Sequence, residues 1–94
     1  MTLLLKDPSA VLDYAIDWGV DYLDDDDILM ESVWAVEPDE TGGVEIVNSS
    51  LGDRVSTVQA SGGTAGRLYR LSNRVVTQSG RTDDRSIVLR VEKR

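Results

Sequence analysis

Apolar and polar residues alternate in several short runs along the chain, and Gly, Pro, Asn and Asp separate the runs. A period of two is typical of strands with one buried face, and no run has the longer period of an amphipathic helix. We therefore expect an all-β fold. Six to seven such strands predict an immunoglobulin-like or fibronectin III-like antiparallel β-sandwich, in one domain over 1–94. The predicted strands are 2–5, 11–18, 28–36, 44–48, 54–60, 67–77 and 85–92.

Both tryptophans fall among residues that are predicted to face inward. In the second run the apolar side chains occupy every second position, with aspartates between them, so Tyr14 and Trp18 are expected in the core. In the third run Trp34 is the natural core residue. A carbohydrate-stacking platform would need these rings to face outward, where acidic side chains point instead. The inward face of the third run is predicted to hold Met30, Ser32, Trp34 and Val36.

The two C-terminal runs are predicted to form a hairpin around Ser79 and Gly80. Tyr69 opens the first of these strands, directly after the glycine-rich stretch 61–66. This is the position of the tyrosine corner of immunoglobulin-like sandwiches, whose hydroxyl bonds to the backbone a few residues upstream. We expect Tyr69 to have that structural role, and Asn73 interrupts the apolar face of the same strand.

Four consecutive aspartates follow the second run, and they are predicted to form an exposed loop because such a cluster resists burial. A solvated loop, or an acidic contact for a basic partner, is the favoured interpretation. Calcium binding is a weaker alternative, because the run lacks the alternating aspartates and the glycine turn of a calcium loop. The residues concerned are Asp24, Asp25, Asp26 and Asp27.

The net charge of −7 argues against nucleic-acid binding, which requires an excess of Lys and Arg. The charge is unevenly divided, because residues 1–53 hold fourteen acidic residues and one lysine, whereas 54–94 hold nine basic and three acidic residues. One interpretation is cross-strand pairing of the outward arginines Arg70, Arg74 and Arg90 with acidic residues of the third run. The other is a directional contact between an acidic end and a basic surface, with copies of the chain or with a charged partner.

The chain contains no cysteine and no histidine, which removes the residues of most hydrolytic, thiol and zinc sites. No nucleophile and base can be singled out, so we expect no enzymatic activity and no cofactor. The N-terminal three-leucine run is too short for a signal peptide, and no stretch is long enough to cross a membrane as a helix. We expect synthesis in the cytoplasm and no membrane partner.

Three stretches together resemble small phage and prophage virion proteins, described as fiber-tail adaptor or tail-associated proteins with an immunoglobulin-like fold. They are DPSAVLDYAIDW, DILMESVWAV and SGGTAGRLYRLSNRVVTQSGRTDDRSIVLRVEKR. The resemblance covers nearly the whole chain, and it departs most at VNSSLGDRVST.

This resemblance implies a structural protein of the virion tail, which joins a tail or fiber component to its neighbours and has no chemistry of its own. Other tail or fiber proteins are the implied partners, and a homo-oligomer is possible. The alternative that the fold class leaves open is a recognition module that binds a ligand or a surface glycan.

Overall fold

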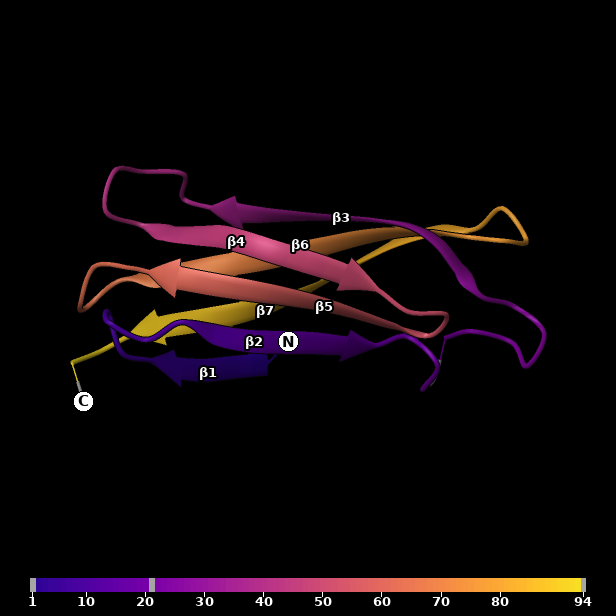
Figure 1. Cartoon of the computed structure of the whole chain (residues 1–94), viewed down its shortest axis with the longest axis horizontal. Coiled ribbons are helices and arrows are strands. Elements are labelled where there is room, and N and C mark those ends of the chain that lie inside the picture. The colour runs from indigo at the N-terminus through magenta and orange to yellow at the C-terminus, as the bar shows by residue number, and fades with distance from the viewer. Residues whose placement is uncertain (1, 21, 94) are drawn as a thin grey trace.

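The computed structural model describes residues 2–20 and 22–93, which form an elongated molecule of 43 × 21 × 17 Å built from strands (Figure 1). No helix in this described part is long and apolar enough to span a membrane. The strands are β1 (Thr2–Lys6), β2 (Leu12–Asp17), β3 (Leu29–Glu37), β4 (Val44–Leu51), β5 (Val55–Gly62), β6 (Leu68–Thr77) and β7 (Thr82–Val91).

The seven strands form two sheets, which confirms the predicted β-sandwich. One sheet has the order β1-β7-β6-β3 and the other the order β2-β5-β4 (Figure 1). Apart from β1, this is the strand order of constant-type immunoglobulin sandwiches, in which the first strand lies beside the second. Here β1 belongs to the other sheet, where it pairs with β7.

Three details differ from the expected strands. The pairing of β1 with β7 is parallel, whereas the other strand pairs are antiparallel. The polar stretch 48–51 continues β4 instead of forming a turn, because it pairs with β5 at a sheet edge where its side chains stay in water. β7 begins at Thr82 rather than at 85, since its first residues pair with the end of β6.

The core lies between the sheets and forms one apolar cluster. Trp18 is fully buried in it, and Trp34 is half-buried against it. The expected inward position of Met30 is wrong, because an irregularity between Leu29 and Glu31 turns Met30 outward. The buried members of the cluster are Tyr14, Ile16, Trp18, Leu23, Leu29, Val44, Val58, Ala60, Tyr69, Leu71, Val75, Ile87, Leu89 and Val91.

A chain of polar side chains crosses this core and joins the two sheets. The indole N–H of Trp18 donates to Oδ1 of Asn73 at 2.9 Å, and Nδ2 of Asn73 donates to Oγ of Ser32 at 2.7 Å. Ser32 and Ser56 share a hydroxyl hydrogen bond of 2.7 Å, and the indole N–H of Trp34 donates to Ser56 at 2.9 Å. Asn73 therefore interrupts the apolar face of β6 because it satisfies the buried indole of the opposite sheet.

Lys6, at the end of β1, is a buried cation that the sequence pattern did not predict. Its Nζ donates to the carbonyl of Gly62 at 2.6 Å and to that of Asp7 at 3.0 Å. Burial lowers the pKa of the Lys6 ammonium, and the charge of Asp7 partly opposes this effect. The lysine thereby ties β1 to the end of β5.

Candidate interaction surfaces

The two tyrosines that were expected to be structural lie in the core with different hydrogen-bonding. The Tyr69 hydroxyl accepts a 2.9 Å hydrogen bond from the backbone N–H of Thr64, five residues upstream. Its ring is 1% exposed. The Tyr14 hydroxyl is buried without a hydrogen-bond partner in the described part of the chain, and burial raises its pKa. Neither ring is available to a ligand on the surface.

The remaining aromatic rings also point inward. The chain has two tryptophans, three tyrosines and no phenylalanine. Tyr22 is half-buried and packs edge-on against Trp18, with ring centroids 5.1 Å apart. Trp34 is half-buried against the core. All five aromatic side chains are therefore at least half-buried, and the rings present no open platform on which a sugar could stack.

The β2–β3 loop carries the four aspartates, and the structure separates one of them from the other three. Asp24, Asp25 and Asp26 are exposed, as expected. The expectation that Asp27 is also exposed is wrong, because its side chain is only 5% exposed. No three acidic residues within 2–20 and 22–93 come together as a metal-binding group.

Asp27 is buried because the β6–β7 turn satisfies its carboxylate. Oδ2 accepts from the hydroxyl of Ser79 at 2.7 Å, and Oδ1 accepts from the backbone N–H groups of Ser79 and Ile28 at 3.1 and 3.0 Å. The guanidinium of Arg81 lies 3.5 Å from the same carboxylate. Hydrogen bonds to the carboxylate, that of the Ser79 hydroxyl first and then those of the Ser79 backbone, Thr77 and Ile28, lower the pKa of Asp27 to about 2 against the opposing effect of burial. Sequence reasoning missed this contact because 52 residues separate the two partners.

Arg54 holds the β2–β3 loop from the opposite side. Its guanidinium lies within hydrogen-bond reach of four backbone carbonyls of the loop, at 3.2 to 3.4 Å. Its own carbonyl accepts from the backbone N–H groups of Trp18 and Gly19 at 2.8 and 3.2 Å. A single arginine from the basic half of the chain therefore fixes the acidic loop. The four carbonyls belong to Gly19, Leu23, Asp24 and Asp27.

Arg81 of the β6–β7 turn and Arg85 of β7 also contact this end of the molecule. Arg81 lies over the ring of Tyr22 at 4.7 Å and donates to the Tyr22 carbonyl at 3.2 Å. Arg85 lies over the ring of Trp18 at 4.6 Å. Both contacts are cation–π interactions, which suit the weakly hydrated guanidinium. These arginines were not singled out from the sequence, since no local pattern indicates which ring they cover.

The three arginines that were expected on the outer sheet face do lie there, in different electrostatic settings. Arg74 forms two hydrogen bonds of 3.1 Å with Asp84 of β7, which raises the pKa of the Arg74 guanidinium. Arg90 lies 2.7 Å from Glu92 of its own chain segment. Arg70 stands opposite Glu37 in the strand register, with no ion pair between them in the described part of the chain.

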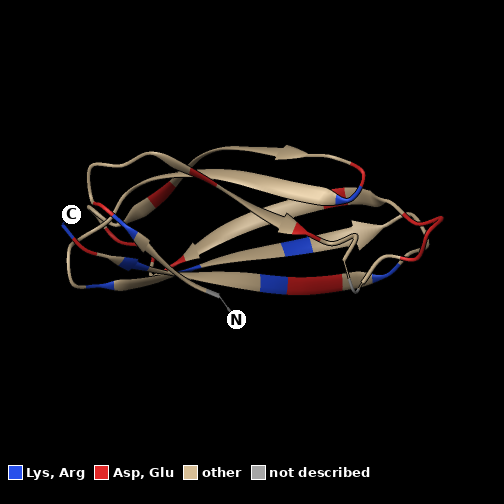
Figure 2. Cartoon of the chain, turned by 90° about the horizontal axis from the view of Figure 1, so that it is seen from below, with Lys and Arg blue, Asp and Glu red and all other residues tan. Residues whose placement is uncertain are grey.

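The uneven division of charge along the sequence is compensated within the fold only in part, because Arg67 and Arg81 are the residues of the basic half that form ion pairs with acidic residues of 1–53 in the described part of the chain. Besides the contacts above, Arg67 binds Glu40 through two hydrogen bonds of 2.8 and 3.0 Å. Figure 2 shows acidic and basic segments side by side at both ends of the molecule. The pairs differ from the expected ones, because Arg74 pairs with β7 and not with the acidic residues of β3. In the β2–β3 loop, Asp24 lies 4.0 Å from Arg81, whereas Asp25 and Asp26 are exposed and form no ion pair within the described residues.

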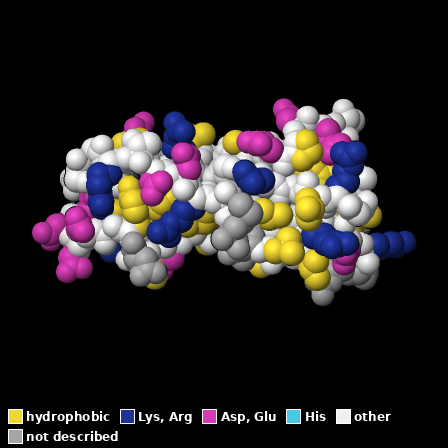
Figure 3. All heavy atoms as spheres, turned by 180° about the vertical axis from the view of Figure 1, so that it is seen from behind, with side chains coloured by type: hydrophobic (Ala, Val, Ile, Leu, Met, Phe, Trp, Pro, Cys, Tyr) yellow, Lys and Arg dark blue, Asp and Glu magenta, His cyan; other side chains and the backbone are white. Residues whose placement is uncertain are grey.

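The outer face of the four-stranded sheet exposes apolar side chains that sequence reasoning did not single out. Leu3 is 59% exposed, Leu5 45% and Leu68 57%. The strand register places Leu5, Arg90 and Leu68 in one row, and Leu3 and Val88 in the next. We call Leu3, Leu5, Leu68 and Val88 the outer apolar face. Figure 3 looks onto this side and shows hydrophobic side chains gathered between Lys and Arg side chains.

An open hollow of about 660 Å³ adjoins this face. It lies where β3 ends at Glu37, and its lining combines apolar and charged groups. Contiguous exposed apolar area of this kind is typical of protein contact sites. The lining residues are Glu37, Pro38, Leu68, Tyr69, Arg70 and Val88.

Comparison with known proteins gives one match over most of the chain. The family model Gp77, described as podophage GP4 fiber-tail adaptor protein gp77, matches residues 6–90. No curated protein matches the chain.

Proposed function

This chain belongs to the Gp77 family of podophage fiber-tail adaptor proteins, and on that basis we propose that it is a non-enzymatic connector that joins tail and fiber components of a virion. The observation that carries the proposal is the family match over residues 6–90, which includes β2 to β6, all of β7 except Val91, and only Lys6 of β1. Incorporation into the virion after synthesis in the cytoplasm is part of the proposal.

The outer apolar face is the surface that we assign to the first partner. A connector must form stable contacts through side chains that are exposed in the isolated chain. Leu3, Leu5 and Leu68 are large, exposed and contiguous in the register of β1, β7 and β6. Protein interfaces of this kind combine apolar side chains with arginines. Here Arg90 stands between Leu5 and Leu68 in the strand register, and Arg70 follows Val88 at the border of the face.

The acidic loop is a secondary contact in this proposal. Asp24, Asp25 and Asp26 are exposed in the β2–β3 loop, which lies at the opposite end of the long axis from the start of β6 (Figure 1). Charges at the border of an interface mainly affect the association rate and partner selection. We therefore assign orientation of the partner, rather than most of the binding energy, to these three aspartates.

The glycan-binding alternative receives less support than the connector. Sugar recognition commonly relies on exposed aromatic rings, and here all five rings are at least half-buried. The exposed apolar residues of the outer face are leucines and valines, which favour contact with a protein.

Two measurements on virions test the connector role. Mass spectrometry of purified particles from the encoding phage should detect the chain in a stoichiometric amount. Particles assembled after deletion of its gene should lack the fiber components and keep their heads. Absence of the chain from intact particles, or deletion particles with normal fibers, would contradict the proposal.

A further inference from the structure

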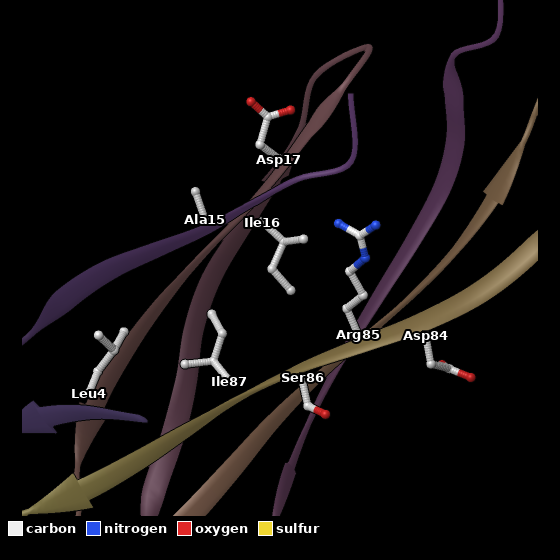
Figure 4. A pocket seen from close by; sticks show the side chains of 8 residues that line it. All are labelled: Leu4, Ala15, Ile16, Asp17, Asp84, Arg85, Ser86 and Ile87. Carbon is white, nitrogen blue, oxygen red and sulfur yellow. The ribbon is translucent and has the colours of Figure 1, made fainter. Parts of the chain in front are cut away.

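A second hollow, of about 620 Å³, lies between the edges of the two sheets on the side of β2 (Figure 4). We call it the β2–β7 hollow. Ile16 from β2 and Ile87 and Arg85 from β7 point into it, and Leu4 of β1 closes one end (Figure 4). The remaining lining residues point away from this space along the alternating pattern of their strands, and they are Ala15, Asp17, Asp84 and Ser86.

Both strands that flank this hollow have a free edge. β2 pairs with β5 on one side and with no described strand on the other. β1 covers β7 only from Ile87 onward, so the first half of β7 is open on that side. Leu12 faces inward in the register of β2, yet it is 39% exposed because no strand covers it. The position beside β2 is the one that the first strand fills in constant-type sandwiches.

The edge of β2 differs from the free edges of β3 and β4. The registers of β3 and β4 are interrupted between Leu29 and Glu31 and between Ile46 and Asn48. Such irregularities discourage the addition of another strand. The register of β2 with β5 is uninterrupted over the whole strand. The register of β1 with β7 is also uninterrupted, but β1 has five residues against the six of β2. β2 is therefore the longer of the two edges that can accept an additional strand.

The positive charge of Arg85 indicates which side chain a strand bound at the β2 edge should carry. Its guanidinium carbon lies 4.6 Å from the Trp18 ring and 5.8 Å from the Tyr22 ring. It forms no hydrogen bond or ion pair within the described part of the chain. A guanidinium that lies over an aromatic ring contacts the ring with its face, so the N–H groups in the guanidinium plane can still donate hydrogen bonds. A carboxylate is the acceptor that best matches their geometry.

From this arrangement we propose that the β2–β7 hollow binds an extended segment of a partner protein, which pairs with the free edge of β2 and carries an apolar side chain two residues from a carboxylate. The spacing follows from the strand period of two. The apolar side chain lies opposite Ile16, against Ile87 and Leu4, and the carboxylate lies beside Trp18 and binds Arg85. Main-chain hydrogen bonds supply affinity in this mode, and the two side chains supply specificity.

This inference rests on the proposed connector function, because it gives the connector a second binding surface apart from the outer apolar face. The partner is then a tail or fiber protein with a segment of this composition. The peptide experiment below separates the two ideas. If the peptide does not bind but the chain is incorporated normally into virions, the β2–β7 hollow is not a binding site for an extended segment, and the connector role is unaffected.

The test uses a synthetic peptide of eight residues with blocked ends, in which threonine alternates with valine and one central valine is replaced by aspartate. Titration of the full chain to about 1 mM peptide, followed by amide NMR, should shift β2 resonances and slow their hydrogen exchange. A peptide with asparagine in place of aspartate should bind about tenfold more weakly. In Arg85→Gln that difference should disappear, whereas in the matched control Arg67→Gln, at an exposed arginine paired with Glu40, it should persist.

Three outcomes would overturn the proposal. The first is that the β2 amides do not respond at the highest peptide concentration. The second is a response confined to the edges of β1, β3 or β4, and the third is an aspartate preference that survives in Arg85→Gln. Dimerisation of the chain through β2 without peptide, detected by light scattering, would identify a second copy as the occupant and would also overturn it.

Discussion

The indole N–H of Trp18 donates a 2.9 Å hydrogen bond to the side-chain oxygen of Asn73, and this bond joins the two sheets through the centre of the core. Asn73 also donates to Ser32 and to the carbonyl of Val33, so its amide serves both sheets. Side chains with buried polar groups are costly unless each group is satisfied. A single amide thus permits both a fully buried tryptophan and a serine inside one sandwich.

Replacement of Asn73 should therefore be strongly destabilising. Asn73→Ala leaves the buried Trp18 N–H without its acceptor, and we expect the free energy of unfolding to fall by about 2–3 kcal/mol. Urea unfolding followed by tryptophan fluorescence measures the change. Asn48→Ala, at an exposed position of β4, is the matched control and should cost less than about 0.5 kcal/mol. Equal effects of the two substitutions would contradict the role of Asn73.

The two buried tyrosines form a second matched pair. Tyr69→Phe removes the acceptor of the Thr64 N–H and should lower the free energy of unfolding by about 0.5–1.5 kcal/mol. Tyr14→Phe removes a buried hydroxyl that has no partner in the described part of the chain, so stability should stay the same or increase. Thermal unfolding of both variants checks the opposite signs. A larger loss for Tyr14→Phe than for Tyr69→Phe would refute this assignment.

Much of the fold follows from local sequence patterns, and these two tyrosines show where such patterns succeed. The alternation around Tyr14 and Tyr69 indicates which face is buried, and the glycine-rich stretch before Tyr69 indicates a corner. The β6–β7 hairpin follows from the turn at Ser79 and Gly80 in the same way. Burial on alternate positions is a property of one strand, so a single sequence is sufficient to predict it.

The surfaces depend on long-range contacts, which a single sequence does not encode in any local pattern. In the sequence nothing distinguishes Asp27 from the three aspartates before it. The difference arises in the fold, where Ser79 of the β6–β7 turn donates to its carboxylate. Arg85 lies over Trp18 only because β7 and the end of β2 meet in space. Met30 faces outward because one irregularity in the register reverses the alternation.

Acid should destabilise the protein through Asp27. The pKa of its carboxyl is lowered from 3.8 to about 2 in the fold, so the folded state binds fewer protons than the unfolded state between these values. The stabilisation by the ionised carboxylate is complete above about pH 4 and is lost as the pH falls toward 2. Urea unfolding between pH 5 and pH 2 should show a steep decline, which becomes shallower in Asp27→Asn.

Asp25→Asn provides the control for this titration, because Asp25 is an exposed residue of the same loop. Its pH profile should follow that of the unmodified chain. If Asp27→Asn and the unmodified chain lose stability in parallel over this range, the Ser79 contacts do not hold the carboxylate in its ionised form.

The order of the acidic loop should depend on Arg54. Arg54→Gln removes the guanidinium that bridges four loop carbonyls, and we expect a stability loss of about 1–3 kcal/mol together with faster amide exchange at Leu23 and Asp27. Arg74→Gln breaks only an exposed ion pair and should cost at most about 1 kcal/mol. Unchanged exchange at Leu23 and Asp27 in Arg54→Gln would show that the loop is held by other contacts.

The most direct test of the connector role concerns the outer apolar face. The double variant Leu3→Glu and Leu68→Glu changes two exposed residues, so the fold should persist while partner binding is lost. The matched control is Thr57→Glu with Gln59→Glu, on the outer side of the other sheet. Circular dichroism establishes that both variants are folded.

Each variant then complements a phage that lacks the gene, and quantitative mass spectrometry measures the ratio of fiber to head protein in purified particles. We predict that this ratio falls by about tenfold or more with the outer-face variant and stays normal with the control. A normal ratio with the folded outer-face variant would contradict the assignment of this face as the surface that joins tail and fiber.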